Sequence, residues 1–263
     1  MTKKLTISTI KKLKNERKLT MITAYDALFS KLFGNTADMI LVGDSLNMSF
    51  GGKPDTLSIT LQQMIYHTQA VSNGAPDTFL ITDMPFGSYT TKEKALDSAL
   101  KVYQQSRADA IKIEGGSDKA EIIKYLVDNG IAVCGHIGLL PQSVRAEGGY
   151  KVKGKDEISA KLLMQDAKDI EQAGAFCIVI EGVKADVASE IAKNISVPLV
   201  GIGAGNSVDG QVLVFSDMLG LFEDFTPKFV KKYLDGAALV KNAVRNYKKE
   251  VESGEFPDEI HTY

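Results

Sequence analysis

Short runs of β-branched and other apolar residues alternate with segments of helical periodicity along most of this chain, and this alternation limits the possible folds. Seven runs are expected to form strands, at residues 20–25, 39–43, 78–82, 109–114, 131–136, 175–181 and 197–203. An eighth strand is expected around Met218 to Leu221, where the apolar stretch is short and contains Gly220. Strands that alternate with helices are typical of a parallel sheet covered by helices.

Helices are expected between the strands, for example at residues 90–107, 117–130 and 156–174. The first has apolar residues at a spacing of 3.6, and the other two end on glycine. Because the composition does not change along the chain, residues 1–263 are predicted to form a single α/β domain, a closed (β/α)8 TIM barrel with an N-terminal helix and C-terminal helices after Thr226. An open doubly wound sheet is the alternative.

Two segments are longer than the usual loop of about 4–6 residues between a strand and a helix. They cover residues 45–60 and 139–156, and loops of such length usually have a function. Within the first, Leu46 to Gly52 is expected not to be helical. The second is rich in glycine and charge, which is typical of a mobile lid.

Charge and hydropathy exclude several classes of partner. The formal net charge is -2, and the 31 Lys and Arg residues are spread along the chain, so neither nucleic acid nor an anionic membrane is an expected partner. No apolar run approaches the roughly 18–20 residues that span a bilayer, and the basic N-terminus lacks the apolar core of a signal peptide. A cytoplasmic protein is expected, with Cys134 and Cys177 as reduced thiols inside apolar strands.

Ionisable residues follow five consecutive predicted strands. In a (β/α)8 barrel the carboxyl ends of the strands meet at one rim, where active sites lie. Each residue alone has a simpler explanation: an Asp after a strand often caps a helix, a Lys and a Glu on one strand can form a structural ion pair, and a single His can be a hydrogen-bonded core residue. Their recurrence on successive strands favours a functional site. The candidate residues are Asp44 and Ser45, Asp83, Lys112 and Glu114, His136, and Glu181.

The residue types at this rim suggest metal-assisted chemistry on an oxo acid. Asp44, Asp83 and Glu114 are hard oxygen ligands, which favour Mg2+ over zinc. Such an ion can chelate a 2-oxo acid through its carboxylate and carbonyl oxygens and make the adjacent C–H more acidic. Glu181 ends an apolar strand, where burial raises the pKa of a carboxyl group, and is therefore a candidate base.

Several segments form long motifs, among them "ITAYD" (22–26), "LVGDSL" (41–46), "KIEGG" (112–116), "VCGHIGLLPQSV" (133–144), "GGYKVKG" (148–154) and "IGAGNSVDGQVLV" (202–214). These motifs resemble one family, ketopantoate hydroxymethyltransferase, over nearly the whole chain from about residue 20. Two residues depart from the common pattern: Leu140 stands where many relatives have Thr, and Asn47 stands where they commonly have Gly.

The resemblance implies an enzyme that transfers the one-carbon unit of 5,10-methylenetetrahydrofolate to C3 of 3-methyl-2-oxobutanoate. The product is 2-dehydropantoate, and the reaction is the first committed step of pantothenate biosynthesis. Family members form large homo-oligomers, commonly decamers, so self-association is expected.

The resemblance also implies roles for the rim residues. Asp44 and Asp83 correspond to carboxylates that bind Mg2+ and contact the substrate, with Glu114 near the ion as a direct or water-mediated ligand. The expected substrate contacts also include Ser45, Lys112 and His136. Glu181 corresponds to the base that takes the C3 proton.

Two other functions remain open at this point. A Mg2+-dependent barrel lyase or mutase of the phosphoenolpyruvate mutase/isocitrate lyase type would share the carboxylates at the strand ends. A barrel that binds a metabolite without converting it is the non-enzymatic alternative.

Overall fold

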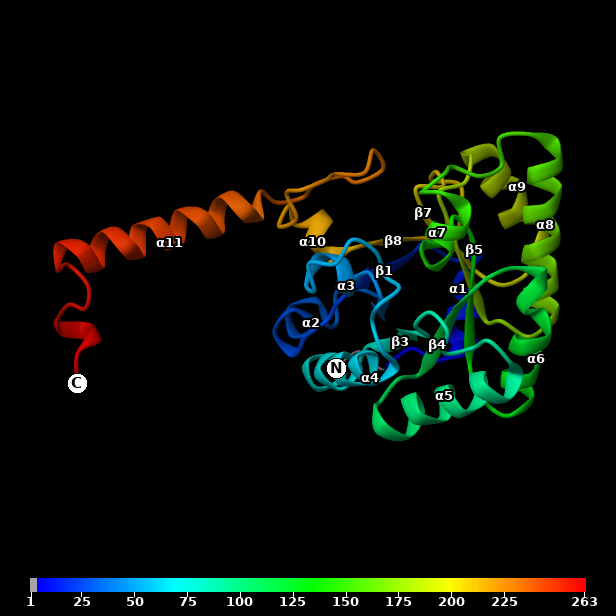
Figure 1. Ribbon diagram of the computed structural model, residues 1–263, viewed down its shortest axis with the longest axis horizontal. Coiled ribbons are helices and arrows are strands. Elements are labelled where there is room, and N and C mark those ends of the chain that lie inside the picture. The colour runs from blue at the N-terminus through cyan, green and yellow to red at the C-terminus, as the bar shows by residue number, and fades with distance from the viewer. Residues whose placement is uncertain (1–3) are drawn as a thin grey trace. The chain divides into compact units, whose positions relative to one another are not determined.

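Eight parallel strands pair in chain order and close into a barrel in the computed structural model, which describes residues 4–263 (Figure 1). β8 pairs with β1 to complete the ring, which confirms the predicted (β/α)8 barrel and excludes the open sheet. The strands are β1 (Leu19–Thr23), β2 (Met39–Val42), β3 (Phe79–Asp83), β4 (Ala110–Glu114), β5 (Val133–Gly138), β6 (Cys177–Glu181), β7 (Leu199–Ile202) and β8 (Gly210–Leu213).

Helices precede the barrel and connect its strands, and Figure 1 shows α5, α6 and α8 on its outer side. Polar side chains start several of them: Thr91 accepts a hydrogen bond from the Lys94 N–H at the start of α5, and Asp156 accepts one from Ser159 at the start of α8. The helices are α1 (Ile7–Leu13), α2 (Ala27–Phe33), α3 (Leu46–Ser49), α4 (Leu61–Gly74), α5 (Lys92–Gln105), α6 (Ala120–Asp128), α7 (Val144–Glu147), α8 (Glu157–Gln172) and α9 (Ala185–Asn194), with short 3-10 turns at Ser117–Lys119 and Pro141–Ser143.

The predicted position of the eighth strand is wrong. The strand is Gly210–Leu213. Of the residues proposed for it, Met218 ends a short helix, α10 (Phe215–Met218), and residues 219–221 follow that helix. A Cβ atom at Gly210 would lie 2.7 Å from the carbonyl oxygen of Leu19, so a glycine is needed where β8 meets β1. The strand therefore begins with the residue type that usually marks a loop.

The interior of the barrel has apolar layers beneath a charged one. Ala110 packs with Met21 and Cys134 in the inner cluster, whereas Ile111 packs with the helices outside. Because side chains alternate along a strand, Lys112 and Glu114 face the interior with Ala110. The same alternation places Asp83, His136 and Glu181 above inner residues of β3, β5 and β6.

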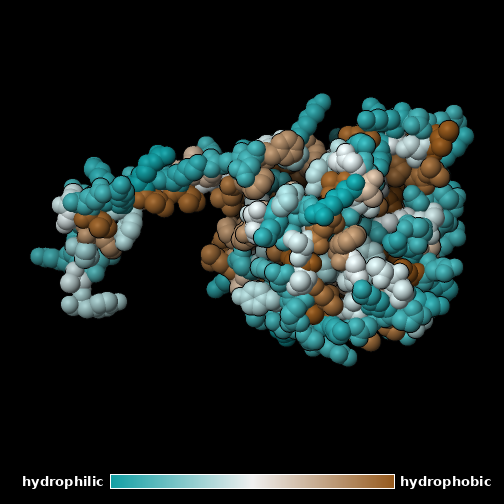
Figure 2. Space-filling view, in the orientation of Figure 1, coloured by the Kyte–Doolittle hydropathy of each residue, from teal (hydrophilic) through white to brown (hydrophobic). Residues whose placement is uncertain are grey.

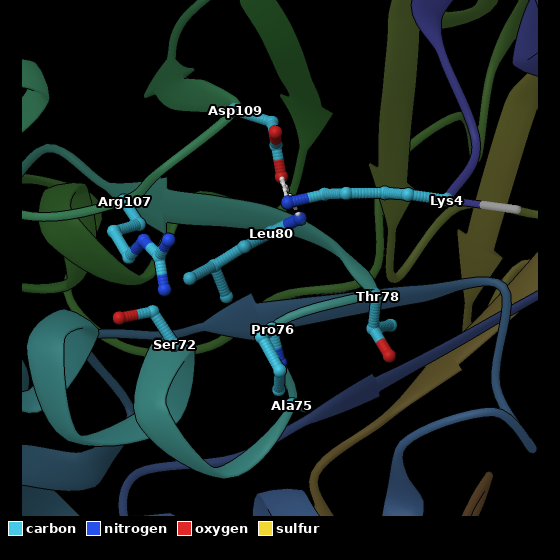
Figure 3. A pocket seen from close by; sticks show the side chains of 8 residues that line it. All are labelled: Lys4, Ser72, Ala75, Pro76, Thr78, Leu80, Arg107 and Asp109. Carbon is cyan, nitrogen blue, oxygen red and sulfur yellow. Dashed lines mark hydrogen bonds and ion pairs between the residues drawn. The ribbon is translucent and has the colours of Figure 1, made fainter.

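A cavity of about 250 Å³ lies at the opposite, amino ends of β3 and β4 (Figure 3). Lys4 and Asp109 form an ion pair of 2.7 Å in it, and the Asp109 carboxylate also accepts a hydrogen bond from the backbone of Leu80. This cavity is on the side of a barrel where residues usually serve stability. Its lining residues are Lys4, Ser72, Ala75, Pro76, Thr78, Leu80, Arg107 and Asp109.

Residues 215–263 form a second compact unit, and the prediction of one domain over 1–263 stays a prediction. Besides α10, this unit contains α11 (Gly236–Ser253), which lies in the region predicted for closing helices, and a 3-10 turn at Glu259–His261. Apolar side chains such as Leu239, Val240 and Tyr247 are exposed on α11 (Figure 2). Over residues 4–263, no helix is both long and apolar enough to cross a bilayer.

Candidate active site

Lys112 lies at the centre of the charged layer. Its Nζ is 3.0 Å from Asp83 Oδ1 and 4.0 Å from Glu114 Oε1, and it donates a hydrogen bond of 2.9 Å to His136 Nδ1. The Lys112 side chain is only 4% exposed. Because an ammonium group can only donate, His136 Nδ1 must accept, and the imidazole proton therefore resides on Nε2.

Burial and the surrounding charges fix the ionisation of these two groups in opposite ways. Burial alone would lower the pKa of Lys112, but the three neighbouring carboxylates together raise it above its ordinary value. Burial, with the positive charge of Lys112, lowers the pKa of His136 well below its ordinary value. The site therefore holds a cationic lysine beside a neutral histidine.

The three carboxylates are held close together and are poorly solvated. The backbone N–H of Asp44 donates to Asp83 Oδ2 at 3.0 Å. Burial raises the pKa of Asp44 well above its ordinary value, and the negative charges of Asp83 and Glu114 raise it further. Burial also raises the pKa of Asp83, against the effect of Lys112, and raises that of Glu114 to about 8. One lysine does not balance three buried carboxylates, so an added cation would stabilise their charged forms.

Glu181 ends β6 beside this cluster. Its Oε2 lies 3.3 Å from His136 Nε2, and its side chain is 19% exposed. Burial raises the pKa of Glu181 to about 8 against the effect of the Lys112 charge, and the carboxylates of Asp44 and Asp83 act in the same direction as burial. A carboxylate with such a pKa is a stronger base than an ordinary glutamate.

Ser45 lies at the start of α3, so the prediction that Leu46 to Gly52 is not helical is wrong for the first turn. Hydrogen bonds such as Phe50 N–H to the Leu46 carbonyl at 2.9 Å form this turn. The Ser45 side chain does not cap the helix but is 2.8 Å from the hydroxyl of Tyr25. Tyr25, fully buried in the "ITAYD" segment, thus supports Ser45 and is a contact that sequence reasoning missed.

Gln142 is the second residue that sequence reasoning missed. Its side chain is almost fully buried and donates hydrogen bonds to Asp44 Oδ2 at 2.8 Å and to the Met84 carbonyl at 2.9 Å. Its backbone N–H donates to Glu114 Oε2 at 3.0 Å. The motif "GLLPQSV" contains this residue, but nothing in the motif indicates that its glutamine reaches the carboxylates.

The two long loops contact each other above the site. Arg145 in α7 donates from Nε and Nη2 to Asp55 Oδ2 at 3.1 and 2.8 Å. Asn47, at the position where relatives commonly have Gly, donates to the Asp55 carbonyl at 2.7 Å and so holds the first loop. The expected mobility of the second loop stays a prediction.

The donor set fits a divalent cation that also uses water and substrate oxygens. Glu114 Oε1 is buried and accepts no hydrogen bond within residues 4–263, and buried Asp83 Oδ1 has the Lys112 ammonium, 3.0 Å away, as its partner. In the same residues, no group of three or more His, Cys, Asp and Glu side chains is arranged to hold a metal by itself. Mg2+ commonly takes only one or two protein carboxylates, so this arrangement matches its preference.

A cavity of about 180 Å³ adjoins the cluster, and Glu114 and Gln142 form part of its wall. It lies between the loops that follow β3, β4 and β5. The remaining lining residues are Phe86, Gly87, Tyr89, Thr90, Gly115, Asp118, Lys119, Leu140 and Ser143.

Comparison with known proteins decides the family. The family model described as ketopantoate hydroxymethyltransferase matches residues 4–259. The chain belongs to this family. It is 66% identical over 263 residues to the 3-methyl-2-oxobutanoate hydroxymethyltransferase of Sulfurimonas denitrificans, with 100% of both chains covered. It is 60% identical to that of Wolinella succinogenes, covering 99% of this chain and 100% of the relative. The chain is therefore a hydroxymethyl-transferring enzyme of the pantothenate pathway.

Similarity to solved structures shows the fold alone, since the sequence identities are low. A 2,3-dimethylmalate lyase, described as a PEP mutase/isocitrate lyase superfamily member, gives a TM-score of 0.60 at 18% identity, with 97% of this chain and 91% of the other covered. A phosphonopyruvate hydrolase in complex with oxalate and Mg++ gives 0.63 at 13% identity, with 97% and 92% covered. The lyase and mutase alternative thus shares the barrel, whereas the high sequence identities are with hydroxymethyltransferases.

Proposed function

We propose that this enzyme transfers the one-carbon unit of 5,10-methylenetetrahydrofolate to C3 of 3-methyl-2-oxobutanoate, forming 2-dehydropantoate. The observation that carries the proposal is the position of Glu181, a carboxylate with a raised pKa, next to the buried cluster around Lys112. Such a cluster suits an oxo acid, whose carbonyl oxygen gains negative charge when the neighbouring carbon loses its proton.

Asp44 and Asp83 would bind Mg2+, and Glu114 would reach it directly or through a water molecule. When bound, this ion supplies Lewis-acid polarisation of the substrate carbonyl. The buried oxygens of Asp83 and Glu114 support this assignment, since Glu114 Oε1 accepts no hydrogen bond among the described residues and a single lysine faces both carboxylates.

Ser45, Lys112 and His136 would contact the oxo acid. The ammonium of Lys112 stabilises negative charge that develops on the substrate oxygen. The Tyr25 hydroxyl holds that of Ser45 in place, and the Nε2–H of His136 can donate a hydrogen bond to substrate or to Glu181.

Glu181 would act as the base. Its carboxylate accepts the C3 proton, and the electron pair left on C3 forms the bond to the incoming carbon. The two carbon–nitrogen bonds that hold this carbon to the folate break, and water supplies the hydroxyl oxygen. The two folate nitrogens gain one proton each, which balances the proton lost from C3 and one proton of the water. The partial exposure of Glu181 leaves a path for substrate and for the return of the proton to solvent.

The folate as co-substrate, assembly into a homo-oligomer such as a decamer, and a cytoplasmic location are further parts of the proposal. They rest on the family to which the chain belongs.

The test is proton NMR of 3-methyl-2-oxobutanoate in D2O with enzyme and Mg2+, following the C3–H signal before and after addition of methylenetetrahydrofolate. We expect chelator-sensitive loss of the signal, followed by formation of 2-dehydropantoate. A folded enzyme that neither exchanges nor consumes the oxo acid would contradict the substrate assignment. Lyase substrates would then be tested in the same assay.

A further inference from the structure

Gln142 forms hydrogen bonds to several separate parts of the candidate site. It lies in the 3-10 turn Pro141–Ser143 after β5 and is 6% exposed. Its amide donates to Asp44 after β2 and to the Met84 carbonyl after β3, and its backbone N–H donates to Glu114 at the end of β4. One residue thus connects four of the barrel's strand ends.

The chemistry of the neighbours determines which way the amide points. Both groups facing Nε2, the Asp44 carboxylate and the Met84 carbonyl, can only accept hydrogen bonds. On the other side, the hydroxyl of Tyr89 donates to Gln142 Oε1 at 2.5 Å. Tyr89 is itself buried, so its hydroxyl has few alternative partners. The reverse orientation would place the amide oxygen against a carboxylate and a carbonyl oxygen, and the two hydrogen bonds that Nε2 donates would be lost.

Gln142 binds each carboxylate through a single oxygen. It contacts Oδ2 of Asp44 and Oε2 of Glu114, and Glu114 Oε1 stays buried without a hydrogen-bond partner among the described residues. A neutral donor can hold carboxylates in this way without cancelling their charge, whereas a lysine or arginine would neutralise the cluster. Carboxylate ligands are commonly oriented by hydrogen bonds of this type.

We propose that Gln142 is a positioning residue that orients Asp44 and Glu114 toward a bound divalent cation, and that Tyr89 orients the Gln142 amide. This inference rests on the proposed function. Because Gln142 belongs to the same long loop as Arg145, the loop that covers the site also arranges its carboxylates.

The test compares Mg2+ binding by calorimetry in three variants. Gln142→Leu removes the amide and keeps similar volume, and Tyr89→Phe removes only the hydroxyl that orients it. Gln165→Leu is the matched control, because Gln165 also donates to a carboxylate, Asp169 at 2.7 Å, but on the exposed surface of α8.

We expect Gln142→Leu to weaken Mg2+ binding about 10- to 100-fold, the usual effect of removing a group that orients a metal ligand. Tyr89→Phe should weaken it less, and adding Tyr89→Phe to Gln142→Leu should have little further effect, since both act through one hydrogen-bond network. Gln165→Leu should bind Mg2+ as the unmodified enzyme does.

The same variants are compared by circular dichroism, thermal unfolding and C3–H exchange. Unchanged Mg2+ affinity in folded Gln142→Leu and Tyr89→Phe would overturn the positioning role. If the unmodified enzyme fails to exchange the C3 proton while Gln142→Leu still weakens Mg2+ binding, the proposed function fails and the positioning role stands.

Discussion

Among single residues, Lys112 and Glu181 differ in how the surrounding structure affects their charged forms. Lys112 is buried but surrounded by carboxylates, so its charge is supported. Glu181 is buried beside a neutral imidazole, and burial together with the carboxylates of Asp44 and Asp83 outweighs the charge of Lys112, so its charged form is disfavoured. The proposed base is therefore a group whose ionisation costs the folded protein stability.

Replacement of Glu181 by Gln should separate activity from stability. We expect C3–H exchange to slow by about 10²- to 10⁴-fold, the usual contribution of a general base. 3-Methyl-2-oxobutanoate should still bind, because the proposed substrate contacts Ser45, Lys112 and His136 are unchanged. Unaltered exchange, measured by NMR, would point to another base.

The same replacement should stabilise the fold in a pH-dependent way. The pKa of Glu181 is raised from about 4.5 in the unfolded chain to about 8 in the folded protein. The folded state therefore holds the proton more tightly, and the stability of the unmodified protein relative to Glu181→Gln falls as pH rises between these values. Chemical unfolding of the metal-free proteins should show a gain of about 1–3 kcal/mol for the variant at pH 8 and little gain below pH 4. A constant difference across this range would contradict the raised pKa.

At the scale of elements, the site depends on two loops that hold each other. The Arg145 and Asp55 side chains connect α7 to the loop after β2, and the Tyr150 hydroxyl lies 3.8 Å from Met48 Sδ. Arg145 is largely exposed, so this ion pair is partly screened by solvent and salt. The ion pair is therefore weak enough to break and re-form as the two loops move apart and together.

Asp55→Asn should loosen the second loop without unfolding the barrel. We expect tryptic cleavage near Lys151 and Lys153 to become roughly two- to fivefold faster, because an exposed ion pair contributes little free energy. The same increase should appear in the unmodified protein at high salt. Glu157→Gln, which removes an exposed pair with Lys161 on α8, is the control. Equal cleavage rates in both variants would show that the ion pair does not restrain the loop.

Sequence reasoning located most elements and the charged rim because both follow from simple periodicities. The alternation of Lys112 and Glu114 with Ile111 and Ile113 places the charged pair and the isoleucines on opposite faces of β4, and the closed barrel makes the charged face the inner one. Local patterns did not reveal β8, whose first residue is explained only by its contact with Leu19. The turn after Ser45 was also missed, since it is only four residues long and Gly51 and Gly52 follow it closely, as in a loop.

Supporting residues were harder to predict than the charged ones. Tyr25 and Gln142 matter because of partners far away in the chain: the Tyr25 hydroxyl meets Ser45, and the Gln142 amide meets Asp44. An isolated Tyr or Gln carries no local signal of this kind. Such contacts depend on the closure of the whole barrel, which places the strand ends side by side.

In the molecule as a whole, the barrel closes where its first and last strands, β1 and β8, pack closely together at Leu19 and Gly210. Gly210→Ala should lower the free energy of unfolding by about 1–3 kcal/mol, because the added methyl group would collide with the Leu19 carbonyl. Thermal unfolding measures this loss, with Gln211→Ala, an exposed position on the same strand, as the control. We expect Mg2+ affinity to stay unchanged in the folded fraction. An unaltered melting temperature would show that β1 and β8 adjust to the extra atom.

The separation of the two barrel ends by apolar layers has an evolutionary consequence. The Lys4 and Asp109 ion pair lies at the amino ends of the strands, whereas the carboxylates lie at the other ends with apolar layers between. A substitution at one end of the barrel should therefore have little effect on the side chains at the other end. Lineages that diverge in growth temperature can vary the amino end while the chemistry at the carboxyl end stays fixed, and laboratory evolution for heat resistance should accept changes there first.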